Sequence, residues 1–363
     1  MNTKLNELAK QDKYLKIAIV GAGKMGKGLI NQMSRIKGML PSLVVNRNVE
    51  KAVNAFLSAG IRKEDIVISN SLNKINYYLE KGKFIATEDM DIATKVNTIQ
   101  AVVDATGVPE VGAKISLDSI ENGKHIIMLN VEADSVVGPI LYKKAKETGV
   151  VYTGTAGDEP GAVMELYNFA VGLGFEVLAI GKGKNNPLDL EANPDSVYEN
   201  ALEKDVKPHM LTGFIDGTNT MIEMTCMANA TGFVPDIRGS HGIDSSIKNL
   251  TNFFRLKKEG GILSKYKIVD YVMGIAPGVF AIFTTRLDEV HKQLQYLNMG
   301  PGPNYVLYRP YHLTSLETPI TIFNACYYKE ATIAPTKGMV AETVAIAKKD
   351  LKIGDRLDGI GGY

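Results

Sequence analysis

The feature that most constrains this chain is an apolar run joined directly to a glycine-rich turn. Leu15–Val20 (LKIAIV) has the composition of a strand that is buried on both faces. It leads straight into Gly21-Ala-Gly23-Lys-Met-Gly26, and a helical pattern then continues to about Lys37. A strand, a G-x-G-x-x-G turn and a helix in this order are typical of the first unit of a Rossmann domain. The sequence therefore predicts an α/β fold with a doubly wound parallel sheet.

Each glycine of this turn has its own steric reason. Gly21 permits the tight turn, Gly23 lets the backbone approach a pyrophosphate, and Gly26 lets the helix pack closely on the strand. The helix N-terminus then offers N–H groups and the positive end of its dipole to the phosphates. We therefore predict that a nicotinamide dinucleotide contacts Gly21, Ala22, Gly23, Lys24, Met25 and Gly26.

The end of the second predicted strand indicates which dinucleotide is preferred. An enzyme that uses NAD carries a carboxylate about 20 residues after the glycines, where it binds the ribose 2′-hydroxyl. Here that position is Asn46, and Arg47 and Lys51 supply positive charge for a 2′-phosphate. NADP(H) is therefore expected in preference to NAD(H). Thr106 and Gly107, in the turn after the strand Ala101–Asp104, are expected to contact the cofactor as well.

Predicted strands and helices alternate as far as residue 152, and the amino-acid composition then changes. Beyond Gly157 the chain is richer in Gly, Asn, Pro and Tyr, as in an α+β domain with long loops. We predict a dinucleotide-binding domain over 1–156 and a substrate and dimerisation domain over 157–338. Residues 339–363 resemble the start of a further, incomplete module with a short strand near Val340.

Charge and cysteine content exclude several classes of protein. The chain has 41 Lys and Arg against 40 Asp and Glu, a net charge of +1, so it lacks the basic excess of nucleic-acid and membrane-surface binders. Its N-terminus lacks the apolar core of a signal peptide, and no window has the ~18 apolar residues of a membrane span. Cys226 and Cys326 have no metal-site spacing, so no metal is expected. These features predict a soluble, cytoplasmic protein.

Ligands of such folds bind at the carboxyl ends of the parallel strands. The catalytic residues are therefore expected in the segments that leave those ends. After the apolar run Phe175–Ile180, Lys182 and Lys184 stand in what we predict to be a glycine-spaced loop. A lysine with a tuned charge is a capable acid or base. The predicted catalytic residues are therefore Lys184, Lys182, Glu132, Asp134 and Glu159, and Asn185 and Asn186 are expected to orient substrate hydroxyls.

Two further segments carry Arg, His and Gly together. They are residues 236–242 (DIRGSHG) and 305–312 (YVLYRPYH). Basic side chains and backbone N–H groups in such loops can converge on one anion. We predict that Arg238, His241, Arg309 and His312 bind a phosphate or carboxylate of the substrate.

The motifs GAGKMG, DATGVPEVG, MLNVEADSVVGPIL, GDEPG, GKGKNNPLD, MANATG, YRPYHLTSLETP and AKKDLKIGDRLDGIGGY resemble a known family. It is the family of homoserine-dehydrogenase-like oxidoreductases with a C-terminal SAF domain, which also contains the type II 1-deoxy-D-xylulose 5-phosphate reductoisomerases. The resemblance covers residues from about 15 to 363. It implies a Rossmann domain, a dimerising substrate domain, a SAF (β-clip) module, and a homodimer or homotetramer.

These observations together predict an NADPH-dependent oxidoreductase for a small polar hydroxy or keto compound, with or without a phosphate group. A reductoisomerase that couples reduction to rearrangement of the carbon skeleton is the first alternative. A dinucleotide-binding sensor without turnover is the second alternative.

Overall fold

A computed structural model describes residues 1–363, which form two compact units. The first unit contains Met1–Ala162 and Leu313–Thr336, and the second contains Val163–His312 and Lys337–Tyr363. Each unit is described by itself below. The domain boundaries predicted from the sequence remain predictions.

The first unit is built on a parallel sheet of seven strands in the order β3-β4-β2-β1-β5-β6-β7. Six of these strands follow the order typical of a Rossmann sheet, and β3 is added at one edge. The predicted doubly wound fold is therefore confirmed. The strands are β1 (Leu15–Val20), β2 (Met39–Val45), β3 (Ile66–Ile68), β4 (Phe84–Thr87), β5 (Ala101–Asp104), β6 (His125–Met128) and β7 (Tyr152–Gly154).

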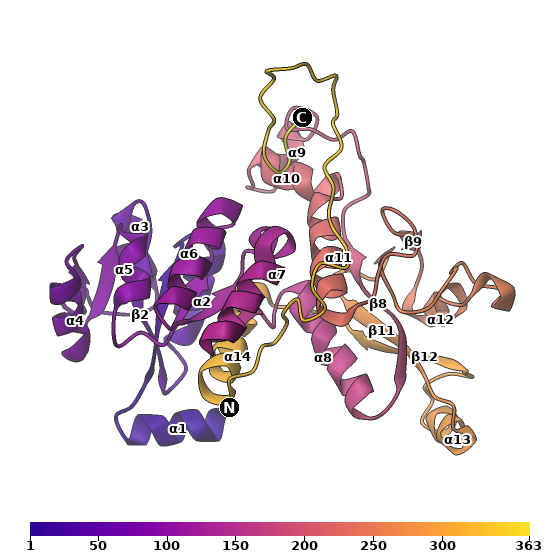
Figure 1. Cartoon of the computed structure of the whole chain (residues 1–363), viewed down its shortest axis with the longest axis horizontal. Helices are drawn as coiled ribbons and strands as arrows, with labels where there is room; N and C mark the ends of the chain where they lie inside the picture. The colour runs from indigo at the N-terminus through magenta and orange to yellow at the C-terminus, as the bar shows by residue number, and fades with distance from the viewer. The chain divides into compact units, whose positions relative to one another are not determined.

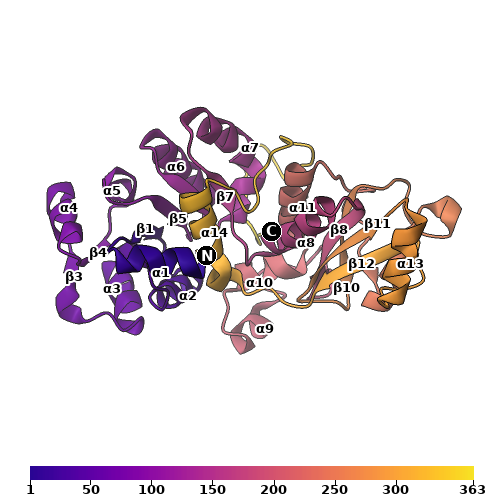
Figure 2. The same ribbon diagram turned by 90° about the horizontal axis from the view of Figure 1, so that it is seen from below.

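Helices cover both faces of this sheet because alternate strand residues point to opposite sides. Ile17 and Ile19 pack on one face, where α2, α3 and α14 supply the apolar partners. Ala18 and Val20 pack on the other face, which α4, α5, α6 and α7 cover. Figure 2 shows α5, α6 and α7 on one side of the strands and α2 and α3 on the other.

The helices of this unit are α1 (Asn2–Lys10), α2 (Lys24–Met33), α3 (Val49–Ser58), α4 (Leu72–Glu80), α5 (Met90–Lys95), α6 (Pro109–Glu121), α7 (Val131–Thr148) and α14 (Thr318–Phe323). A π-helical turn, Asn324–Tyr328, follows α14. The chain then bonds to β7, since the Gly154 N–H donates to the Ile333 carbonyl at 2.8 Å. In this way residues 313–336 are part of the first unit.

The second unit contains a mixed sheet of five strands in the order β12-β11-β8-β10-β9. β8, β10 and β9 are parallel, whereas β11 pairs antiparallel with both β8 and β12. The strands are β8 (Glu176–Lys184), β9 (Ile243–Asp244), β10 (Ile268–Met273), β11 (Val279–Thr284) and β12 (Asn304–Arg309). Residues 305–312, predicted to form a loop, thus include most of the edge strand β12.

α11 packs against β8 and β10 on one face of this sheet, and Leu250 and Phe254 pack on the other. The helices of the unit are α9 (Tyr198–Glu203), α10 (Pro208–Ile215), α11 (Thr218–Thr231), α12 (Leu250–Phe253) and α13 (Asp288–Tyr296). α8 (Glu159–Gly172) runs from the first unit into the second. None of the helices in either unit has the length and apolar character needed to cross a membrane.

Residues 337–363 contain neither helix nor strand, so the predicted short strand near Val340 is wrong. Instead, this C-terminal segment follows α11 and the turns around α9 and α10 as an irregular chain (Figure 1). The Asn229 side-chain oxygen accepts hydrogen bonds from the N–H groups of Val340 and Ala341, at 2.8 and 3.1 Å. The segment gains its backbone partners from α11 rather than from a sheet.

Candidate functional site

The glycine turn lies between β1 and α2, where the parallel strands end. Gly21 has a φ of +105°, and a Cβ there would lie 2.6 Å from the Ala105 carbonyl oxygen. A Cβ on Gly26 would lie 1.9 Å from the Gly21 carbonyl oxygen, so both positions demand glycine. Gly23 is the N-cap of α2, and a Cβ there would meet nothing within 4 Å. These are the steric roles that the sequence predicts for the three glycines.

Asn46, at the end of β2, braces this turn. Its side-chain oxygen accepts a hydrogen bond from the Ala22 N–H at 3.1 Å, and its amide donates to the Asn48 carbonyl at 2.9 Å. The side chains of Arg47 and Lys51 beside it are exposed. The amide therefore orders the turn, and the basic groups are free to reach a ligand in solvent.

A buried carboxylate organises the neighbouring turn after β5. Asp104 accepts hydrogen bonds from the N–H and hydroxyl of Thr106, at 2.9 and 2.7 Å, and from the Asn130 amide at 2.9 Å. Burial raises the pKa of the Asp104 carboxyl, although these donors oppose the shift. Asn130 also caps α7 by accepting from the Ala133 N–H at 3.1 Å. Sequence reasoning missed Asp104 and Asn130, although the D-A-T spacing of a side-chain turn was a signal for the first.

Two predicted catalytic acids lie within the first turn of α7, which begins at Val131. Asp134 is buried and accepts a hydrogen bond from the Tyr152 hydroxyl at 2.7 Å, so it ties α7 to β7. Glu132 is half-buried in the first turn of the helix. Burial raises the pKa of the Glu132 carboxyl, and the charge of Asp104 raises it further. Glu159, the third acid, is half-buried at the start of α8.

Lys182 and Lys184 lie in β8 rather than in a loop, because the strand continues through the glycines between them. A Cβ on Gly181 would lie 1.8 Å from the Asp270 carbonyl oxygen, and one on Gly183 would lie 2.4 Å from the Ala276 nitrogen. The glycines therefore permit neighbouring backbone to approach closely; they do not signal a flexible turn. Since alternate residues of a strand share a face, both lysine side chains point to the same side of the sheet.

Both lysines are buried, with exposed fractions of 7 % for Lys182 and 4 % for Lys184. The Lys182 ammonium forms an ion pair with the buried Glu223 of α11, and Lys184 donates to the Phe214 carbonyl at 2.6 Å. Burial lowers the pKa of Lys184, and the charge of Lys182 lowers it further, while Glu223 and Asp216 oppose these effects. A buried ammonium whose pKa is lowered is a better proton donor near neutral pH than an ordinary lysine.

The other predicted substrate residues do not all gather around this pair. Asn185 and Asn186 follow β8 directly, so they are the next residues after Lys184 in the sequence. Arg309 is on β12, where it pairs with Glu165 at 3.0 Å. His312 follows that strand and is half-buried.

Arg238 and His241 precede β9, at the opposite edge of the sheet from β12. Four inter-strand steps of ~4.8 Å separate the two edge strands by about 19 Å. The two arginine- and histidine-containing segments therefore do not form one anion site. The two segments have similar compositions, but residues 304–309 form the edge strand β12, and its Arg309 pairs with the Glu165 carboxylate.

His241 instead belongs to a cluster with Asp236. Its ring Nε2 lies 2.9 Å from the Asp236 carboxylate, which also accepts hydrogen bonds from the hydroxyl and N–H of Ser264. Burial by itself raises the pKa of Asp236, but the bonds from Ser264 and His241 outweigh it and lower the pKa to about 2. These hydrogen bonds join the two ends of the segment 236–241 to each other and to Ser264.

The Asp236 cluster gives a pH-dependent stability that can be measured. Because the folded pKa of about 2 lies below the usual 3.8, the carboxylate stabilises the fold above pH ~4, and that contribution is lost as the pH falls toward ~2. Asp236→Asn should therefore lower the free energy of unfolding at pH 6 and differ less from wild type as the pH approaches 2. Urea unfolding over this range measures the difference. The exposed Asp350→Asn is the control, and a difference that is constant with pH would contradict the assignment.

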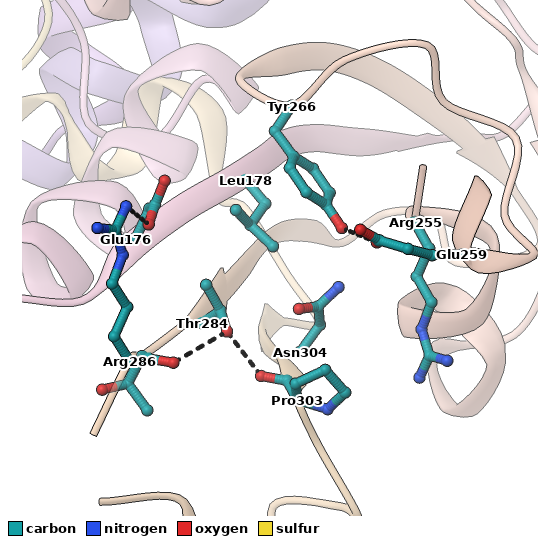
Figure 3. Close-up of a pocket in the computed structure, with 10 residues that line it drawn as sticks. Glu176, Leu178, Arg255, Glu259, Tyr266, Thr284, Arg286, Pro303 and Asn304 are labelled. Carbon is teal, nitrogen blue, oxygen red and sulfur yellow. Dashed lines mark hydrogen bonds and ion pairs between the residues drawn. The ribbon is translucent and has the colours of Figure 1, made fainter. Parts of the chain in front are cut away.

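A separate hollow of about 340 Å³ lies at the other end of β8, where the strand begins. Figure 3 shows the Tyr266 hydroxyl directed at Glu259 and the Arg286 guanidinium directed at Glu176, on either side of Leu178. Neither lysine of β8 lines this hollow. Glu176 and Arg286 of this hollow therefore pair with each other, and Glu259 accepts a hydrogen bond from Tyr266, apart from the lysine cluster.

Comparison with known proteins assigns a class to the part of the chain that carries this cluster. Residues 157–318 match the family model described as Oxidoreductase DRL, catalytic domain. This match indicates an enzyme of the oxidoreductase class, as predicted, and the matched residues include β8 with both lysines. The resemblance to homoserine-dehydrogenase-like enzymes and to a SAF module stays a prediction. No curated protein sequence matches the chain.

Solved structures that resemble this chain are distant from it in sequence. A probable dehydrogenase from Thermotoga maritima is 13 % identical, with a TM-score of 0.47 over 90 % of this chain and 92 % of that one. Apo scyllo-inositol dehydrogenase from Lactobacillus casei is 16 % identical, with a TM-score of 0.33 over 48 % of this chain and 46 % of that one. The chain spans about half the length of the first two structures it matches.

Proposed function

We propose that this enzyme transfers a hydride between NADP(H) and a small polar hydroxy or keto compound. The observation that carries the proposal is the pair of buried lysines on β8, inside the matched catalytic domain. The glycine turn of the first unit supports a dinucleotide, because Gly23 leaves open space at the N-terminus of α2. When bound, the nicotinamide would supply or accept the hydride.

In this proposal Lys184 moves the proton. Reduction of a carbonyl places negative charge on its oxygen, which the ammonium of Lys184 neutralises by donating a proton; oxidation of a hydroxyl reverses this transfer. The charge of Lys182 lowers the pKa of Lys184, and Glu223, the ion-pair partner of Lys182, opposes that effect. The Phe214 carbonyl fixes the direction of the Lys184 ammonium. Asn185 and Asn186 are proposed to orient substrate hydroxyls at the end of the strand.

Cofactor preference gives a first test of the proposal. Arg47 is exposed beside the glycine turn and Asn46 carries no charge, so a 2′-phosphate would gain a charge-assisted contact. Such a contact contributes about 1.5–3 kcal/mol, which is tenfold or more in affinity. We expect NADPH to bind at least ~10-fold more tightly than NADH, and Arg47→Ala to remove most of that difference. Fluorescence titration of both cofactors measures this. Arg35→Ala, on the same unit but away from β2's end, is the control; equal affinities in the wild type would refute the preference.

A further inference from the structure

The turn between α10 and α11 is held by lysines from two different parts of the chain. Lys184 donates to the Phe214 carbonyl at 2.6 Å, and Lys348 donates to the Asp216 carboxylate at 2.8 Å. The same carboxylate accepts the Thr218 N–H at 2.9 Å, so Asp216 also orders the start of α11. Three consecutive residues, 214–216, thus link the proposed proton donor to a lysine of the C-terminal segment.

Lys348 is built into this place. Its ammonium donates to the Ala192 carbonyl at 2.5 Å and to the Gly362 carbonyl at 3.2 Å, besides its bond to Asp216. The side chains of Lys348 and Asp216 are only 14 % and 7 % exposed. A buried ion pair with further hydrogen bonds to both partners is costly to break, because one charge is then left without its partner.

The backbone of the C-terminal segment is anchored on both sides of Lys348. Asn229 of α11 binds the N–H groups of Val340 and Ala341, and the Thr343 hydroxyl lies 2.8 Å from that of Thr225. After Lys348, the Gly361 carbonyl lies 3.1 Å from the His209 ring. These anchors place a residue from outside the matched catalytic domain, 157–318, beside the lysine cluster.

We propose that Lys348 is a positioning residue for Lys184, acting through Asp216. The proposal rests on the proton-transfer role given to Lys184 above. Lys348 neutralises the Asp216 carboxylate and fixes the turn whose carbonyl receives the Lys184 ammonium. The C-terminal segment thereby helps to set the charge that the reacting lysine experiences.

The charges around Lys184 within this unit determine the expected direction of each change. They are Lys182 on its own strand, Glu223 on α11, and Asp216, whose charge Lys348 offsets. Without the Lys348 charge, Asp216 would favour the protonated form of Lys184 and raise its pKa. Without the Asp216 charge, Lys184 would face Lys182 and Lys348 with less compensation, and its pKa would fall.

The test is a titration of the full chain labelled with ¹³C at lysine Cε, with the Lys184 signal assigned by its loss in Lys184→Met. We expect Lys348→Gln to raise the Lys184 midpoint by about 0.5–1 pH unit, Asp216→Asn to lower it by a similar amount, and Lys348→Arg to keep the wild-type value. Lys352→Gln, an exposed lysine of the same segment, should change nothing. Circular dichroism checks that each variant is folded.

Opposite shifts in Lys348→Gln and Asp216→Asn support the proposal. Equal midpoints in all variants, or shifts of the same sign, overturn it. If Lys348→Gln does not fold, Lys348→Met, which also removes the charge, takes its place, and an unchanged Lys184 midpoint in that variant overturns the proposal. The titration needs no substrate, so it is separate from the proposed function. An active Lys184→Met enzyme would refute the role of Lys184 in catalysis, whatever the midpoint of Lys184 in the wild type.

Discussion

Lys184→Met is expected to lower turnover by at least ~100-fold while the affinity for NADPH stays unchanged, because a positioned proton donor acts mainly in the transition state. Methionine has a similar length and removes the buried charge, so the fold should tolerate it. The measurement is steady-state kinetics with NADPH and the best substrate found, together with a cofactor titration. Near-normal turnover would move the proton transfer to Glu132 or Glu159.

Two controls separate catalysis from folding. Lys352→Met removes an exposed lysine and should leave turnover and stability unchanged. Lys182→Met should instead destabilise the protein, by about 3–5 kcal/mol on the usual scale for a broken buried ion pair, because it leaves the buried Glu223 carboxylate without its lysine. Loss of activity with retained stability in Lys184→Met is therefore the result that marks a reacting group.

The second large effect is expected in the glycine turn, where two alanine substitutions should behave differently. In Gly23→Ala the new Cβ has open space and an ordinary backbone conformation, so the protein should be as stable as wild type. The same Cβ would occupy the room that a pyrophosphate needs, and NADPH affinity should fall by at least ~100-fold, about 2.7 kcal/mol or more.

In Gly26→Ala the Cβ would lie 1.9 Å from the Gly21 carbonyl oxygen, so the turn itself must move. We expect both weaker NADPH binding and a loss of about 1–3 kcal/mol or more in the free energy of unfolding. Urea unfolding and fluorescence titration measure the two effects, and Gly172→Ala, in open space at the end of α8, is the control. A Gly23→Ala variant that binds NADPH normally would contradict a phosphate site at this turn.

Sequence reasoning predicted the first unit well because its signals are local. β1 spans the same residues as the predicted strand, and the steric demands at Gly21 and Gly26 are those of the fingerprint. The bond from Asn130 to Asp104 joins residues 26 apart in the sequence, so no local pattern predicts it.

The second unit was predicted less well because glycine occurs both in loops and at close backbone contacts within strands. Around Lys182 and Lys184 it was taken to indicate a loop, whereas close backbone contacts with β10 and Ala276 require it in a strand. Both lysines are buried, and their predicted catalytic role stays a prediction. Their partners Glu223 and Asp216, and the distant Lys348, come from separate elements, and no spacing in the sequence links them.

The most direct test of the proposed hydride and proton transfer is NADPH consumption with a panel of small polar keto compounds, sugar phosphates included, by wild-type and Lys184→Met enzyme. We predict that at least one compound supports consumption by the wild type, with one equivalent of hydroxy product formed, and that Lys184→Met loses this activity while it still binds NADPH. Equal consumption by both proteins would contradict the account.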